Sequence, residues 1–165
     1  MYISNNCGYC PYMKNFVRED TEASEEEDST VETNADPNST LCEQFASILK
    51  GKVTESKPGS CAVEKDRGNL NVTISGIPVK TVLKGEFSFQ GMNAVGRALN
   101  LGEIVVLQDE LNRFLTALKR NGIDISGVHN HWIYDNPRIL YVHFQSVENP
   151  LNFARKVAEA LRVLK

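Results

Sequence analysis

The sequence has no long apolar run and no marked excess of positive charge. No stretch approaches the roughly eighteen consecutive apolar residues of a membrane helix, and residues 1–6 lack the start of an export signal. The net charge of -3 includes no concentrated basic stripe for nucleic acid. We therefore expect no membrane or nucleic-acid partner, a cytoplasmic location, and four reduced cysteines.

Composition predicts one folded domain preceded by an acidic tail. The 165 residues are 41% hydrophobic and 24% charged, which is typical of a globular protein with a single core. Residues 18–40 are rich in acidic and small polar residues and lack aromatics, so they cannot bury enough apolar surface to fold. This predicts an N-terminal segment over 1–17, a disordered linker over 18–40 and one domain over 41–165.

Hydrophobic periodicity divides the domain into helices and short strands. Apolar residues at helical spacing predict three helices: 41–50, a second from Gln108 or Asp109 to Asn121-Gly122, and 150–164. Alternating or continuous apolar runs predict strands over 52–56, 61–65, 70–75, 86–90 and 103–107. This order favours an α+β two-layer sandwich, with a mostly antiparallel sheet, helices on one face and a ferredoxin-like flavour.

All three histidines fall within one predicted hairpin. β-branched and aromatic residues flank the Asp-Asn-Pro turn at 135–137, which is typical of two joined strands. Matching the apolar faces pairs His129 with His143 and His131 with Tyr141, so the three imidazoles share the face turned away from the core. The residues expected on the core face are Val128, Trp132, Leu140, Val142 and Phe144.

Three imidazoles on one face are typical of a metal site with an open coordination position. We therefore predict that His129, His131 and His143 bind a divalent transition metal, zinc being the first candidate. Glu103 and Glu110 are the candidates for a catalytic base or a fourth ligand. The alternative is that the histidines are structural and hydrogen-bonded at the sheet surface.

Two further residues are candidates for binding a substrate. Arg138 follows Pro137 at the mouth of the hairpin and could hold a carboxylate or phosphate, or could be a surface arginine at the end of a turn. Tyr141 shares the histidine face and could donate a hydrogen bond to a ligand, or pack on a neighbouring side chain.

The cysteines allow several interpretations. Cys7 and Cys10 form a Cys-x-x-Cys element typical of redox or metal sites, but no strand–helix unit surrounds it, so incidental cysteines in a tail are the favoured alternative. A four-cysteine zinc site with Cys42 and Cys61 would have undistinguished spacing. We expect Cys42 and Cys61 to pack in the core as small apolar side chains.

Residues 85–163 resemble the LppY/LpqO family of domains of unknown function, and residues 41–84 do so more loosely through Cys42, Phe45 and Cys61. The matching positions are Asp109, Glu110, Asn112, His129, Asn130, His131, Pro137, Arg138 and His143. From this sequence we expect the protein to depart from the lipoprotein members in lacking a signal peptide and lipobox and in having a single copy of the domain. The resemblance implies that the histidines form the site, and it implies no particular reaction.

Two classes of function follow. In the first, the chain is a small metal-dependent enzyme, hydrolytic in reaction, that acts on a small molecule at the open sheet face. In the second, it is a noncatalytic ligand-binding module, or a homodimer whose copies meet through that face.

Overall fold

The computed structural model describes residues 40–165. The predictions for Cys7 and Cys10, and for nearly all of the 18–40 linker, lie outside these described residues.

The described part contains three helices and nine strands. The helices are α1 (Leu41–Leu49), α2 (Leu111–Arg120) and α3 (Pro150–Leu161). The strands are β1 (Lys52–Lys57), β2 (Ser60–Asp66), β3 (Val72–Ile74), β4 (Ile77–Val79), β5 (Lys84–Gln90), β6 (Ala98–Leu107), β7 (Asp124–His129), β8 (Asp135–Asn136) and β9 (Ile139–Glu148). The three predicted helices and most predicted strands agree with these elements, although β6 begins five residues earlier than expected. The short strands β4 and β8 were not predicted, and β8 lies where a hairpin turn was expected.

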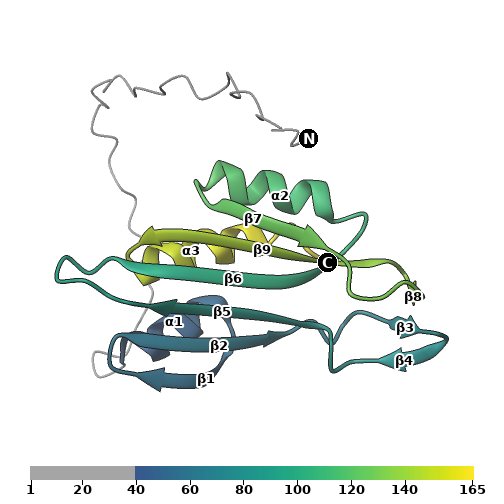
Figure 1. The fold of residues 1–165 in the computed structure, drawn as a ribbon, viewed down its shortest axis with the longest axis horizontal. Coiled ribbons are helices and arrows are strands. Elements are labelled where there is room, and N and C mark those ends of the chain that lie inside the picture. Colours follow the sequence, from purple (N-terminus) through teal and green to yellow (C-terminus); the bar gives the residue numbers. More distant parts are fainter. Residues whose placement is uncertain (1–39) are drawn as a thin grey trace, which may run out of the picture. The chain divides into compact units, whose positions relative to one another are not determined.

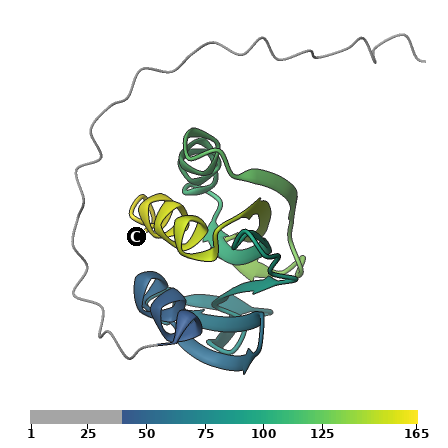
Figure 2. The ribbon, with the colours of Figure 1, turned by 90° about the vertical axis from the view of Figure 1, so that its left-hand side faces the viewer.

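Six strands form one antiparallel sheet in the order β1-β2-β5-β6-β9-β7, and all three helices lie on one face of it (Figures 1 and 2). A small sheet of order β4-β3-β8 lies at one end (Figure 1). β6 and β7 both pair antiparallel with β9, so they run parallel to each other with α2 as their connection. This split βαβ unit is the ferredoxin-like part, and the predicted α+β class is confirmed.

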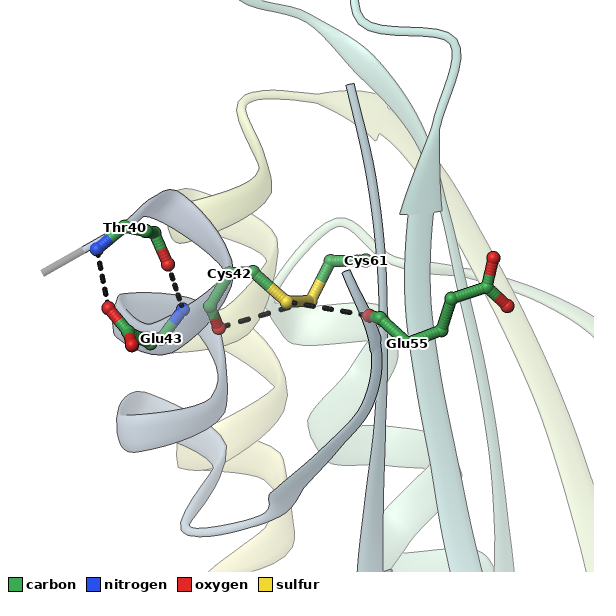
Figure 3. Close-up of a disulfide and its surroundings, with 5 residues drawn as sticks. All are labelled: Thr40, Cys42, Glu43, Glu55 and Cys61. Carbon is green, nitrogen blue, oxygen red and sulfur yellow. Dashed lines mark hydrogen bonds between the residues drawn. A yellow bond between two sulfur atoms is a disulfide. The ribbon is translucent and has the colours of Figure 1, made fainter. Parts of the chain in front are cut away.

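Local sequence sets where the helices begin. The Thr40 hydroxyl accepts a hydrogen bond from the Glu43 N–H (3.2 Å), and the Glu43 carboxylate accepts one from the Thr40 N–H (2.7 Å), which is a capping box (Figure 3). α3 begins with Asn149 as N-cap and Pro150 in its first turn, as predicted. These caps satisfy backbone N–H groups of the first turn and so set where α1 and α3 begin.

Successive residues of β9 face two different cores. Val142 and Phe144 belong to the large core between the sheet and the helices, where Gly102 lies opposite Phe144 and leaves room for its ring. Tyr141 belongs to a small core on the other face, under the three-stranded sheet. The small core consists of Leu70, Val72, Leu83, Val105, Ile139 and Tyr141. It covers one end of that face and leaves the middle open.

Cys42 and Cys61 are joined in a disulfide that links α1 to β2 (Figure 3). Both are buried as predicted, but the expectation that they are reduced is wrong. α1 packs so that the two Cα atoms lie 5.5 Å apart, which is within the reach of a disulfide. Because disulfides are rare in the reducing cytosol, the cysteines no longer support a cytoplasmic location.

Candidate functional site on the open sheet face

A row of four ionisable residues crosses the middle of the open face. In the sheet register Glu64 lies opposite Glu86, Glu86 opposite Glu103, and Glu103 opposite His143. Residues directly opposite one another in antiparallel strands point to the same face, so these side chains are neighbours. Adjacent carboxylates repel, so this row contributes little to stability and concentrates negative charge.

Two of the histidines meet at the end of this row. Nε2 of His129 lies 2.7 Å from Nε2 of His143, and Nδ1 of His143 lies 3.4 Å from a Glu103 carboxylate oxygen. The register of β7 against β9 is shifted by two residues from the expected one. His129 pairs with Tyr141 instead of His143, and His143 pairs with Gly127. A shift of two keeps the same face, so His129 and His143 still meet.

His131 lies just beyond the end of β7 and contributes a ring contact. Its ring lies against that of Tyr141, with centroids 4.0 Å apart and an 18° angle between the planes. It is also nearly parallel to the His129 ring, at a centroid distance of 4.9 Å. Within residues 40–165, no group of three or more His, Cys, Asp or Glu side chains is arranged to hold a metal ion.

The predicted core face of the hairpin is partly wrong. Val142 and Phe144 are fully buried and Leu140 is partly buried against the same core. Val128 lies opposite Val142 and so shares its face as predicted, but on the edge strand β7 it is 40% exposed. Trp132 packs with Tyr141 against the small core on the opposite face, since the chain leaves β7 before this residue.

The two candidate acids have different surroundings. Glu103 is half-buried beside His143. Glu110 is fully buried and accepts hydrogen bonds from the Arg67 guanidinium (2.8 and 3.0 Å) and from the backbone N–H groups of Leu107 and Lys165 (each 2.8 Å). Burial raises the pKa of Glu110, but these hydrogen bonds outweigh it and lower that pKa to about 2. A substrate cannot reach the Glu110 carboxylate, because the residue is fully buried. Its hydrogen bonds indicate a structural role.

Arg138 and Tyr141 are also held by the protein itself. The Arg138 Nε lies 3.1 Å from a carboxylate oxygen of Asp135, and its guanidinium donates to the Ile133 carbonyl (3.3 Å). The Tyr141 hydroxyl donates to the Val82 carbonyl (2.8 Å). Burial, followed by the charges of Glu103 and Asp135, raises the pKa of Tyr141 to about 12. Tyr141 does share the histidine face, but only 5% of the residue is exposed and its ring is covered by that of His131.

The open face is hollowed in two adjoining places. The main hollow, of about 510 Å³, is lined by Thr54, Ala62, Val63, Glu64, Glu86, Phe87, Ser88, Leu101, Gly102, Glu103, Ser126, His143 and Phe144. The side hollow, of about 190 Å³, is lined by Thr81, Val82, Lys84, Glu86, Glu103, His131, Trp132 and Tyr141. Glu86 and Glu103 border both hollows.

Glu64 and Glu86 were missed by the sequence reasoning. Both alternate with buried residues in their strands, so an outward direction could be read from the sequence. Their alignment with Glu103 depends on strand order and register, which the local pattern does not contain. The Lys84 ammonium lies 2.8 Å from a Glu64 carboxylate oxygen and balances its charge, whereas the Glu86 carboxylate has no hydrogen bond or ion pair among residues 40–165.

Comparison with known families assigns the chain. The sequence profile of the family described as Domain of Unknown Function (DUF1259) matches residues 43–163, so the chain belongs to this family. The LppY/LpqO name is not part of that match and stays a prediction. No curated protein and no solved structure matches the chain. Among residues 40–165, no helix has the length and apolar character needed to cross a membrane.

Proposed function

We propose that the open sheet face binds a divalent transition metal between Nε2 of His129 and Nε2 of His143, with zinc as the first candidate. The contact of 2.7 Å between these two nitrogens carries the proposal. Two nitrogens that ligate one tetrahedral zinc at about 2.0–2.1 Å lie about 3.3 Å apart. The two nitrogens would therefore need to move apart only slightly to ligate one ion.

Glu103 supports this by orienting His143. On this proposal Nδ1 of His143 carries its proton towards the Glu103 carboxylate, 3.4 Å away, so Nε2 of His143 is the acceptor. His129 would then donate the proton between the two rings. Carboxylate–histidine pairs of this kind orient metal-binding imidazoles in many proteins. On this proposal a metal ion replaces that proton.

His143 and Glu103 line the main hollow, so a ligand there would lie beside the imidazole pair. His131 is exposed and lies two residues after the end of β7, and a change in its side-chain rotamer would be needed for it to serve as a third ligand. A bound water would complete the set and would become a nucleophile near neutral pH, with Glu103 as the neighbouring base. A metal-dependent hydrolysis of a small molecule is the reaction that this arrangement would support.

A homodimer through the same face is the second candidate. Leu101 and Val147 are 37% and 57% exposed on the open face, which a second copy would bury. His129 is also exposed, so a metal could bridge two copies.

Metal binding tests the proposal directly. Zinc and nickel are titrated into metal-free protein by calorimetry, and bound metal is measured by elemental analysis. The wild type should bind one ion per chain, and His129→Ala and His143→Ala should each weaken binding by at least tenfold.

Gln145→Ala is the matched control. Gln145 is the next outward residue of β9 after His143 and makes no contact with the imidazoles, so its removal should leave the affinity unchanged. A wild type that binds neither metal, or a His143→Ala variant that binds as tightly as wild type, would refute the metal site. Sedimentation of the metal-loaded protein distinguishes a site within one chain from a bridge between two.

A further inference from the structure

The side hollow combines an aromatic wall with two carboxylates. Trp132, Tyr141 and His131 line it, with centroids 6.0 Å apart for Trp132–Tyr141 and 5.1 Å for His131–Trp132. Glu86 and Glu103 line it as well and lie directly opposite each other on β5 and β6. Its volume of about 190 Å³ is roughly that of six water molecules, which is the size of a small head group.

This lining has the chemistry that binds an organic cation. The face of a tryptophan ring attracts a cation through the ring quadrupole, and it does so best when the cation is weakly hydrated. Trp132 is only partly buried, whereas Tyr141 is 5% exposed and packs behind it. Two neighbouring carboxylates repel each other until a positive charge comes between them. We propose that the side hollow binds an alkylammonium group, with the rest of the ligand extending into the main hollow.

Lys84 is a cationic side chain beside the side hollow, but its ammonium is bound by a different carboxylate. Lys84 also lines the side hollow, but its ammonium is hydrogen-bonded to Glu64 at 2.8 Å. That hydrogen bond raises the pKa of Lys84, and the charges of Glu64, Asp66 and Glu86 add to the effect. Glu86 and Glu103 therefore stay available to a ligand.

This inference rests on the proposed ligand site of the open face and names the class of ligand. Glu103 borders both hollows and lies beside His143. A ligand anchored by its cationic group in the side hollow would therefore reach the imidazole pair with its uncharged part.

The single tryptophan makes the test specific. Trp132 is the only tryptophan in the chain, so its fluorescence and its indole NMR signal both report on the side hollow. Metal-free protein is titrated with tetramethylammonium, and with tert-butanol as a neutral probe of similar shape. Tetramethylammonium should shift both signals saturably, and tert-butanol should not.

Charge variants decide the outcome. Glu86→Gln should weaken tetramethylammonium binding at least fivefold, and Lys84→Gln should strengthen it, because the first removes a negative charge and the second a positive one. Ser88→Ala is the matched control, since Ser88 follows on β5 but lines only the main hollow. Equal responses to both probes, or unchanged binding in Glu86→Gln, would refute the alkylammonium site.

The two proposals fail separately. Glu86→Gln should leave zinc affinity unchanged, because Glu86 has no contact with either imidazole. His129→Ala should abolish zinc binding and leave the response to tetramethylammonium intact. Loss of the ammonium response together with intact zinc binding would overturn the further inference alone.

Discussion

Glu110 on the helix side and Glu103 on the open face are the same residue type in opposite circumstances. Glu110 is fully buried and has four hydrogen-bond donors around its carboxylate. Glu103 is half-buried, lies beside Glu86, and has one imidazole within 4 Å. The first arrangement compensates a buried charge, and the second leaves charge available to a ligand.

The same contrast holds for the two faces of the sheet as a whole. The helix side is filled by phenylalanine and aliphatic side chains, and a disulfide joins α1 to β2 on that side. The open face is covered at one end only, by the small core, and its middle is a row of carboxylates and imidazoles. We infer that stability resides on the helix side and function on the open face, and the following changes test this.

Glu110→Gln should cause the largest loss of stability. It leaves the buried Arg67 guanidinium without its counter-charge, which costs about 3–5 kcal/mol in the free energy of unfolding. Urea unfolding at neutral pH measures this. Glu103→Gln is the matched control and should change stability by less than about 0.5 kcal/mol.

The same carboxylate sets an acid limit. Its folded pKa of about 2 lies below the ordinary value of 4.5, so its stabilisation is present above pH 4.5 and is lost as the pH falls towards 2. Wild type should therefore lose stability steeply over that window, and Glu110→Gln should lose less. Parallel pH profiles for the two proteins would contradict the assigned role of Glu110.

Removal of the Cys42–Cys61 disulfide should cause the next largest loss of stability. The crosslink closes a loop with a sequence separation of 19, for which the chain-entropy estimate is about 3 kcal/mol. The double variant Cys42→Ala/Cys61→Ala is compared with wild type by urea unfolding, and peptide mass spectrometry checks the pairing. A wild type isolated with both thiols free would show that the crosslink does not form.

Val142→Ala and His143→Ala test the two faces at adjacent positions. Val142 is fully buried in the large core, so its truncation should cost roughly 1–3 kcal/mol. His143 points to the open face, so its removal should cost less than about 0.5 kcal/mol while abolishing metal binding. If His143→Ala destabilises as much as Val142→Ala, the histidine pair is structural and the division between the faces fails.

Much of the architecture could be predicted because it depends on local periodicity. Alternation along β9 placed Val142 and Phe144 inside and His143 outside, and the caps at Asn149 and Pro150 marked the start of α3. The prediction for Trp132 failed where periodicity ends, because a residue beyond the last strand pair has no defined parity. Val128 does share the face of Val142, but on an edge strand it stays 40% exposed.

The sequence by itself determined the α+β class, the outward face of His129 and His143, and the burial of Cys42 and Cys61, because side-chain period and hydrophobicity act over a few residues. Only the tertiary structure decided which residues meet across that face. These contacts join segments far apart in the chain. They are the β7–β9 register with its two-residue shift, the row from Glu64 to Glu103, the pairing of Arg67 with Glu110, and the disulfide. Such contacts depend on strand order and helix packing. The free energy that selects them comes from the whole core, so no short stretch of sequence predicts them.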